Sequence, residues 1–173
     1  MSANPKIIIQ CLDPTIHDRE GFDCGVSELN DYLARRARKE VAAGVAACFV
    51  ATEEEHGSRI VGYYTLSAAT IKRTSLPENL VKKLPRYQEL PATLLGRLAV
   101  AVDRNGRGIG TRLLFSAMTR CLDASTEIGA LALVTDPKND AAAEFYGRFG
   151  FQPLVSDRLF LPMQDIKQLL SAR

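Results

Sequence analysis

The sequence lacks the features of membrane proteins and of secreted, disulfide-bonded proteins. It contains no run of about 18 apolar residues, so we expect no membrane-spanning helix. The N-terminal stretch MSANPKIIIQCLDP carries one lysine, and its apolar part is too short for a secretory signal. The four cysteines are scattered without a CxxC pair, which argues against a disulfide framework and a zinc site. These absences predict a cytoplasmic protein with reduced thiols.

Histidine and net charge are also scarce. His17 and His56 are the only histidines, and neither belongs to a cluster of metal-ligating residues, so no metal is expected. The formal net charge of +2 is too small to imply a polyanionic partner by itself. The cations are nevertheless gathered in two stretches, one formed by Arg35, Arg36, Arg38 and Lys39, and one by Lys72, Arg73, Lys82, Lys83 and Arg86.

The length of 173 residues and the 46% hydrophobic content are those of one globular domain, which we expect to span 1–173. Apolar and alternating runs predict strands, and amphipathic runs predict helices. The expected strands are 6–12, 45–54, 59–71, 91–102, 128–136 and a closing pair, FQPLV and RLFLPM. The expected helices are 75–84, 109–123, 139–150, a tail helix QDIKQLLSAR, and a first helix with Ser27 as N-cap and Gly44 as C-cap. The predicted fold class is α/β, with a mixed, mostly antiparallel sheet and helices over both faces.

The stretch DRNGRGIGTRLL places Gly106, Gly108 and Gly110 at alternate positions between a predicted strand and a predicted helix. This layout binds phosphate, because side-chain-free residues let backbone N–H groups converge and the helix N-terminus adds positive potential. The stretch is not a Walker loop, since no Gly-Lys-Ser/Thr is present, and not the G-x-G-x-x-G dinucleotide fingerprint. Taken alone, it is equally consistent with a tight strand-to-helix turn.

A second motif lies in NDAAAEFYGRFGF, which contains Asn139, Ala142, Tyr146, Gly150 and Phe151. Tyr146 lies on the apolar stripe of the predicted helix. In an arbitrary helix such a residue is more often a core tyrosine whose hydroxyl is satisfied internally.

Together the two motifs resemble the GNAT superfamily of acyl-CoA-dependent N-acetyltransferases. That superfamily carries a (Gln/Arg)-x-x-Gly-x-(Gly/Ala) loop after its central strand and a later Asn-x-x-Ala-x-x-x-Tyr-x-x-x-Gly-Phe helix. Here Asn105 stands where the superfamily has Gln or Arg. The resemblance implies a single GNAT-like domain that uses acetyl-CoA as co-substrate. The residues it implies for acetyl-CoA binding are Leu98, Val100, Asn105, Gly106, Arg107, Gly108, Ile109, Gly110, Thr111 and Asn139.

The resemblance also implies roles for these residues. The amides of 106–111 would bind the pyrophosphate, with Arg107 and Arg112 adding charge. Backbone groups of Leu98 and Val100 would pair with the pantetheine arm as an added strand does, and an N–H of the same strand would polarise the thioester carbonyl. Tyr146 would protonate the departing thiolate, since a phenol of pKa about 10 and a thiol of about 8.5 are close enough for general-acid catalysis.

A narrower resemblance joins FDCGVSELNDYL, GRLAV, FYGRFGF and LFLPM to the toxin branch of GNAT enzymes from bacterial type II toxin–antitoxin modules. Members of that branch acetylate the α-amine of aminoacyl-tRNA and so block translation. They are commonly homodimers neutralised by a small ribbon-helix-helix antitoxin. This chain departs from the branch at Ala101, where Asp usually follows LAV. The resemblance implies tRNA contacts for Arg35, Arg38, Lys39 and Arg97; without it, the first basic stretch is an ordinary solvated helix face.

No Glu or His emerges as a general base, and Glu53, Glu54 and Glu55 are interpreted as a charge run at the end of a hairpin. An α-amine titrates at about 7.7–8.0, whereas a lysine side chain titrates at about 10.4, so an enzyme without a dedicated base suits an α-amine. Two alternatives stay open. One is acetylation of a small amine, a polyamine or a protein N-terminus; the other is a non-catalytic acyl-CoA-binding regulatory module.

Overall fold

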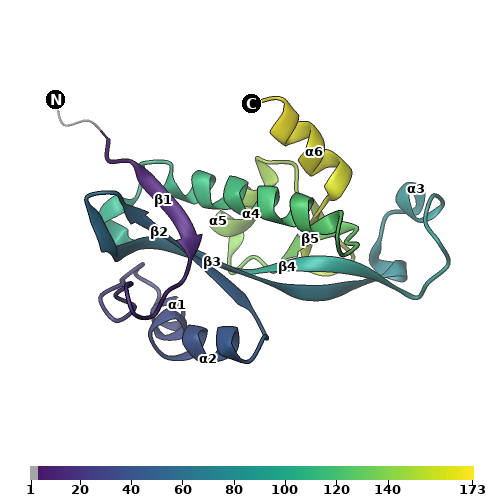
Figure 1. Ribbon diagram of the computed structural model, residues 1–173. Coiled ribbons are helices and arrows are strands. Elements are labelled where there is room, and N and C mark those ends of the chain that lie inside the picture. Colours follow the sequence, from purple (N-terminus) through teal and green to yellow (C-terminus); the bar gives the residue numbers. More distant parts are fainter. Residues whose placement is uncertain (1–3) are drawn as a thin grey trace. The chain divides into compact units, whose positions relative to one another are not determined.

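The computed structural model describes residues 4–173, so the first three residues of the predicted domain lie outside the described residues (Figure 1). Within this range, seven strands pair in the order β1-β2-β3-β4-β5-β7-β6. The β4–β5 pair is parallel, whereas the β1–β2, β2–β3, β5–β7 and β6–β7 pairs are antiparallel. The predicted α/β class with a mixed, mostly antiparallel sheet is confirmed.

The elements follow the predicted segments closely. The strands are β1 (Ile7–Cys11), β2 (Ala47–Glu53), β3 (His56–Lys72), β4 (Glu89–Val100), β5 (Ala132–Thr135), β6 (Gln152–Pro153) and β7 (Leu159–Pro162). The α-helices are α1 (Ser27–Asp31), α2 (Ala37–Ala42), α3 (Glu78–Val81), α4 (Ile109–Ser125), α5 (Asp140–Gly147) and α6 (Met163–Ser171). A π-helical turn, η1 (Tyr32–Arg36), joins α1 to α2, and η2 (Arg73–Ser75) and η3 (Val102–Arg104) are 3-10 turns.

The chain forms two compact units. The first unit comprises Met1–Ser67 and Arg97–Ala117, and the second comprises Ala68–Gly96 and Met118–Arg173. Strands β3 and β4 and helix α4 each contribute to both units.

In the first unit, helices cover both faces of the sheet. The side chains on one face of β2 and β3 pack in one core against the helical segment formed by α1, η1 and α2, which we call the first helical run. The residues of this core include Leu33, Ala37, Cys48, Val50 and Tyr63. On the other face, the Phe49 and Tyr64 rings stack 5.1 Å apart, and the Tyr64 hydroxyl hydrogen-bonds Ser116 of α4 at 2.8 Å. Because strand side chains alternate between faces, α1–α2 and α4 lie on opposite sides of these strands.

Helix α4 approaches β3 closely at one glycine. A Cβ added to Gly62 would lie 2.9 Å from Cδ1 of Leu113 and 3.0 Å from the carbonyl oxygen of Ala99. Both distances are too short for a normal contact, so this position requires glycine for packing rather than for backbone conformation.

The first helix corrects one prediction and confirms another. Val26 occupies the N-cap and no side chain caps the helix, so the prediction of Ser27 as N-cap is wrong; Ser27 is already helical. The helix ends next to Gly44 as predicted, but Ala43 is the C-cap and Gly44 follows it. Gly44 has φ 74°, its N–H donates to the Val41 carbonyl at 3.1 Å, and the next N–H donates to Glu40 at 2.9 Å. This is the Schellman arrangement that commonly terminates helices.

The π-helical turn η1 shifts the apolar stripe of this helix. The Ala37 N–H bonds to the Tyr32 carbonyl, five residues back. The wider turn lets both Tyr32 and Leu33 become fully buried, whereas Val41, four residues after the buried Ala37, is 39% exposed. Such turns inside α-helices are frequent at functional sites.

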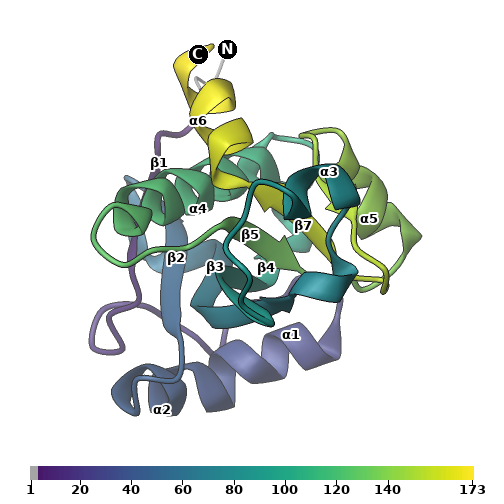
Figure 2. The same cartoon turned by 90° about the vertical axis from the view of Figure 1, so that its right-hand side faces the viewer.

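In the second unit, β4, β5 and β7 carry a separate core. It includes Leu90, Ala92, Val134 and Phe160, packed against Leu80, Val81 and Leu84 of the segment around α3. This segment, residues 73–88, connects β3 to β4 and is seen with α3 in Figure 2. We call it the β3–β4 arm.

Candidate active site

The glycine loop, residues 105–110, lies at the start of α4, and its residues 105–108 are exposed. Gly106 and Gly108 have φ of 77° and 76°, a left-handed conformation that glycine adopts without strain, and Gly110 lies within the first turn of α4. A Cβ added at Gly106 or Gly108 would meet no atom within 4 Å. The Arg112 N–H donates to the Gly108 carbonyl at 3.1 Å. The preceding N–H groups of the helix, those of Ile109, Gly110 and Thr111, have no intrahelical acceptor. This arrangement fits a pyrophosphate group.

The polar side chains in and directly after the glycine loop differ in their contacts. Asn105 and Arg107 are exposed. The Arg112 guanidinium donates from Nη2 to the Ile7 carbonyl at 3.3 Å, which ties it to β1. Arg107 is therefore the loop cation that is better placed to turn toward an anion.

The end of β4 offers backbone groups on one edge. Strand β4 pairs with β5 from Thr93 to Leu95, and β5 ends at Thr135. Leu98 and Val100 therefore lie beyond the part of β4 that pairs with β5. The N–H of Ala101 donates to the Val61 carbonyl of β3 at 2.9 Å. Successive residues of a strand point their N–H groups to opposite edges, so those of Leu98 and Val100 point away from β3. This edge can accept an extended amide chain.

Tyr146 lies in α5 with a buried side chain, only 6% exposed. Burial raises the pKa of its phenol, and a hydrogen bond with the Thr135 side chain partly offsets that rise. The Thr135 hydroxyl in turn donates to the Leu95 carbonyl at 2.9 Å. A phenol with a raised pKa keeps its proton at neutral pH, which a general acid requires.

Asn139 has a structural role that we did not predict. It is the N-cap of α5, and its Oδ1 accepts the Ala142 N–H at 2.9 Å. Its predicted contact with acetyl-CoA stays a prediction.

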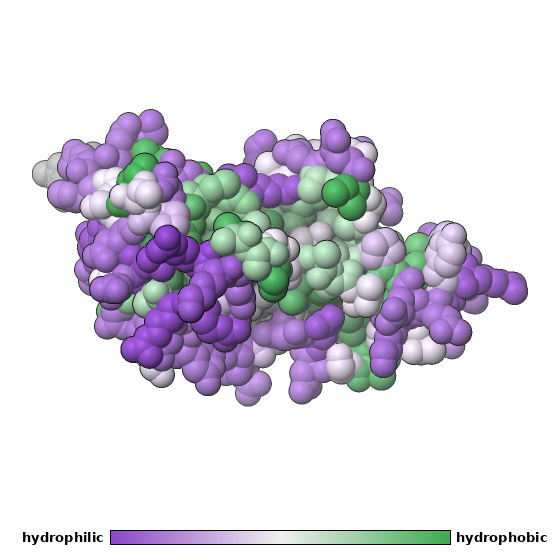
Figure 3. Space-filling view, turned by 60° about the horizontal axis from the view of Figure 1, so that its bottom comes forward, coloured by the Kyte–Doolittle hydropathy of each residue, from purple (hydrophilic) through white to green (hydrophobic). Residues whose placement is uncertain are grey.

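The basic residues of the first helical run are exposed. Arg35, Arg38 and Lys39 all point into solvent, and hydrophilic side chains gather on the face that carries α1 and α2 in Figure 3. Arg36 differs from them, since it donates to Glu40 Oε1 at 3.1 Å. Three cations of α2 and η1 are thus exposed and available to an anionic partner.

Arg97 has a different setting from these three. It is half-buried, and the central carbon of its guanidinium lies 3.5 Å from the centroid of the Tyr32 ring. The Tyr32 hydroxyl donates to Glu40 Oε2 at 2.6 Å. Within residues 4–173, Arg97 forms no ion pair. The Arg97 guanidinium is therefore held by contact with an aromatic ring. Arg97 directly precedes Leu98 in the sequence.

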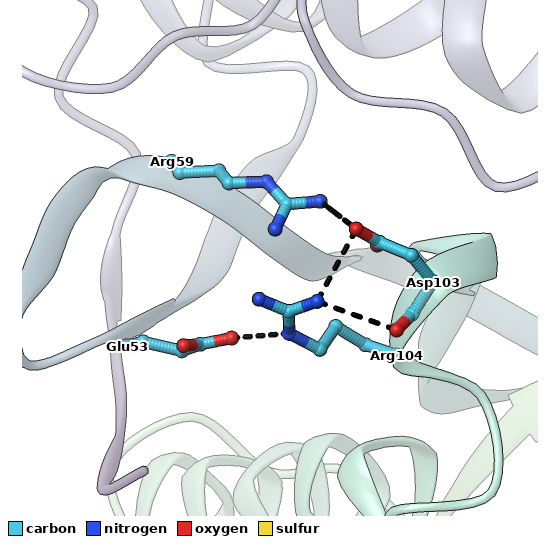
Figure 4. Close-up of polar contacts among 4 residues, drawn as sticks. All are labelled: Glu53, Arg59, Asp103 and Arg104. Atoms are coloured by element: carbon cyan, nitrogen blue, oxygen red, sulfur yellow. Dashed lines mark hydrogen bonds and ion pairs between the residues drawn. The ribbon is translucent and has the colours of Figure 1, made fainter.

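Residues 53–55 lie at the end of the β2–β3 hairpin, as expected, but Glu53 differs from its two acidic neighbours. Glu54 and Glu55 are exposed, but Glu53 is 6% exposed and forms an ion pair with Arg104 (Figure 4). The Arg104 side chain lowers the pKa of the Glu53 carboxyl. Sequence reasoning missed this pair because its members lie 51 positions apart and share no motif.

The two units divide the predicted site residues. The glycine loop, Leu98, Val100, Arg97 and the basic helix belong to the first unit, whereas Tyr146 and Asn139 belong to the second. No group of three or more His, Cys, Asp or Glu in residues 4–173 could hold a metal ion. None of the helices in this part of the chain is long and apolar enough to cross a membrane.

Comparison with known proteins finds a matching family and matching structures. Residues 44–153 match the acetyltransferase (GNAT) domain. The chain is 34% identical over 155 residues to a tRNA-acetylating toxin of Mycobacterium tuberculosis (strain ATCC 25618 / H37Rv), covering 88% of this chain and 90% of the relative.

Two solved structures share the fold over nearly the whole chain. AtaT complexed with acetyl-methionyl-tRNAfMet has a TM-score of 0.89 and 30% identity, covering 95% of this chain and 99% of that one. A tyrosine-to-phenylalanine mutant of the AtaT toxin, bound to the C-terminus of the antitoxin AtaR and to acetyl-CoA, has a TM-score of 0.81 and 26% identity, covering 95% and 98%.

Proposed function

The chain belongs to the GNAT acetyltransferase family, and from that premise we propose that it acetylates the α-amine of aminoacyl-tRNA with acetyl-CoA. In this proposal it is the toxin of a type II toxin–antitoxin pair and inhibits translation. The observation that carries the choice of acceptor is Arg97, a half-buried cation stacked on Tyr32, directly before the strand edge at Leu98. Such a cation suits an acceptor that brings a phosphate close to the reacting amine.

Acetyl-CoA supplies an activated acetyl thioester, and the chain's own residues hold it. The open φ-positive glycines leave room for the pyrophosphate, which the N–H groups of Ile109, Gly110 and Thr111 bind with added charge from Arg107. Leu98 and Val100 pair with the pantetheine amides through their backbone, as an added strand pairs with a sheet edge. An N–H of this edge polarises the thioester carbonyl. Asn105 and Asn139 complete the predicted set.

Tyr146 supplies the proton that the departing thiolate takes up. Its raised pKa keeps the phenol protonated at neutral pH. The acceptor needs little help from a base, because an α-amine titrates at about 7.7–8.0. Glu53 and Glu40 of the first unit are both held in hydrogen bonds to arginine. Carboxylates held in this way are poorly suited to take up a proton, which favours an aminoacyl ester over a lysine side chain.

The tRNA contacts the cationic surface of the first helical run through its phosphates. Arg35, Arg38 and Lys39 are exposed, and one of the matching relatives is a tRNA-acetylating toxin. The exposed Lys82, Lys83, Arg86 and Tyr87 of the β3–β4 arm form a second surface of the same character, since Tyr87 is 66% exposed and offers a ring on which a base can stack.

The partners follow from the same family. We propose a ribbon-helix-helix antitoxin that neutralises the enzyme, and a homodimer as the active form. The AtaT structure bound to the C-terminus of its antitoxin supports the first of these. The proposed location is the cytoplasm, where aminoacyl-tRNA and acetyl-CoA are both present.

Labelled acetyl-CoA tests the acceptor. The purified protein is incubated with a pool of charged tRNA and, in parallel, with uncharged tRNA, polyamines and a peptide with a free N-terminus. The proposal predicts label on charged tRNA alone. Label on polyamines or on the peptide would make the small-amine or N-terminal alternative correct. Binding of acetyl-CoA with no labelled product would instead favour a non-catalytic acyl-CoA-binding module.

A further inference from the structure

An ion network of four residues lies directly before the glycine loop, entirely within the first unit. Glu53 ends β2, Arg59 lies in β3, and Asp103 and Arg104 belong to η3. The Arg104 guanidinium binds Glu53 through Nε and Asp103 Oδ2 through Nη1 at 3.2 Å. Arg59 Nη2 donates to the same Asp103 oxygen at 2.6 Å, so charges alternate along the network (Figure 4).

The two ends of this network differ in how far their side chains are buried. The side chains of Glu53 and Arg104 are 8% and 19% exposed, whereas those of Arg59 and Asp103 are 44% and 51% exposed. An exposed ion pair contributes little, but a buried pair that loses one member leaves an uncompensated charge. Backbone hydrogen bonds hold the start of η3, since the Val102 N–H donates to the Asp23 carbonyl at 3.0 Å. The Glu53–Arg104 pair is the buried part of the network that holds its end, next to the glycine loop.

The position of the glycine loop depends on what holds its two ends. Arg104 is two residues before Gly106, and Ile109, which is 3% exposed, begins α4. Between these fixed points, Gly106 and Gly108 have open space on the side where a Cβ would project. The loop is thus held at Arg104 and Ile109, and there is little packing between them. A displacement of either end would therefore move the backbone N–H groups of the loop.

We infer that Glu53 is a positioning residue for acetyl-CoA: through Arg104 it holds η3 and so sets where the loop amides meet the pyrophosphate. The same contact keeps the Arg104 guanidinium on Glu53, which leaves the pyrophosphate to the backbone N–H groups and Arg107. This inference rests on the proposed assignment of the glycine loop to acetyl-CoA.

Calorimetric titration with CoA and with pantetheine, which lacks the pyrophosphate and the nucleotide, tests the inference. The proteins are the wild type, Glu53→Gln, Arg104→Gln and the double variant. Each single variant is expected to bind CoA about tenfold more weakly, a factor that corresponds to about 1.4 kcal/mol. Pantetheine binding is expected to stay unchanged. The double variant should bind CoA no more weakly than either single one, because the two residues act as a pair.

Glu54→Gln is the matched control. It removes the same charge from the adjacent residue, whose ion pair with Lys6 at 3.5 Å is exposed, and it should bind CoA as the wild type does. If Glu53→Gln does not fold, CoA binding by the double variant tests the inference instead, because the double variant leaves no unpaired buried charge. CoA binding of wild-type strength in Glu53→Gln or in the double variant would overturn the inference. Equal losses of affinity for CoA and pantetheine would also overturn it. A wild type that binds CoA no better than pantetheine would contradict the loop assignment itself.

Discussion

The guanidinium carbon of Arg97 lies 3.5 Å from the centroid of the Tyr32 ring, and the hydroxyl of that same ring donates to Glu40 at 2.6 Å. The π-helical turn η1, which begins at Tyr32, is the local distortion that accompanies this burial of the ring. The arrangement fixes the direction of a cation next to the strand edge proposed for the acetyl donor. Its energetic contribution is that of a cation–π interaction, about 0.5–2 kcal/mol depending on desolvation.

Arg97→Lys should therefore weaken use of the acceptor more than use of the donor. Lysine keeps the charge but lacks the planar group that stacks on Tyr32. We expect the KM for aminoacyl-tRNA to rise roughly threefold to tenfold, in line with the loss of the planar stacking on Tyr32 and a weaker cation–π interaction. Steady-state kinetics with each substrate varied in turn measures this. Arg36→Lys is the control, because its guanidinium lies 5.4 Å from the same ring centroid. An equal rise for both variants would refute a specific role for Arg97.

The double variant Arg35→Ala and Arg38→Ala should bind tRNA more weakly and with a flatter salt dependence. Removing one interaction with a phosphate reduces the slope of log K against log salt by roughly 0.7–0.9. Filter binding at several salt concentrations measures the slope. Arg36→Ala, on the same helix but paired with Glu40, should change it less. An unchanged slope in the double variant would show that these residues do not contact the tRNA.

Tyr146→Phe should abolish most turnover while leaving acetyl-CoA binding within about twofold. Removing a general acid costs about 100-fold or more in rate, whereas the ring that packs in the core is kept. Single-turnover acetylation and calorimetry provide the two measurements. Tyr87→Phe makes the same chemical change at an exposed position and should leave the chemical step unaffected. If Tyr146→Phe retains wild-type turnover, Tyr146 is not the acid.

Thr135→Val should move the high-pH decline of kcat to higher pH. Tyr146 acts in its protonated form, so activity falls as the pH passes the pKa of its phenol. The Thr135 side chain lowers that pKa, and its removal therefore raises it. Thr135→Ser keeps a hydroxyl and should reproduce the wild-type profile. A pH–rate profile that is identical in the Val variant and the wild type would exclude this positioning of the acid.

Gly62→Ala should destabilise the fold by about 1–3 kcal/mol, the usual cost of overpacking. The added Cβ would lie 2.9 Å from a Leu113 methyl group and 3.0 Å from the Ala99 carbonyl oxygen. Urea unfolding measures the free-energy change. Gly57→Ala, where a Cβ would meet no atom within 4 Å, should cost much less. Equal stability of the two variants would contradict the close approach of α4 to β3.

The strands, the helices and the glycine loop could be predicted because each is encoded by local pattern. The helical spacing of Leu113, Leu114, Ala117, Met118 and Cys121 marks one face of α4, and all five are fully buried. Gly106 and Gly108 adopt the left-handed conformation that glycine takes without strain. The resemblance carried by Tyr146 and Asn139 agrees with the GNAT match.

The features that were missed depend on residues far apart in the sequence. Glu53 is one of three adjacent acids, and only the fold brings Arg104 to it. Tyr32 and Arg97 are likewise distant in sequence, and no helical periodicity predicts the π-helical turn that accompanies their contact. The capping role of Asn139 does have a local signal, since Asn before a helical run is a preferred N-cap, but the family motif suggested a different role.

The position of the transferred acetyl group tests the proposed acetylation of aminoacyl-tRNA most directly. After reaction with acetyl-CoA and a charged tRNA pool, nuclease digestion releases the 3′-terminal aminoacyl-adenosine, and mass spectrometry locates the acetyl group. We predict N-acetyl-aminoacyl-adenosine, formed by the wild type and strongly reduced with Tyr146→Phe. Unmodified aminoacyl-adenosine, or an acetyl group on the nucleotide in place of the α-amine, would contradict the proposed activity.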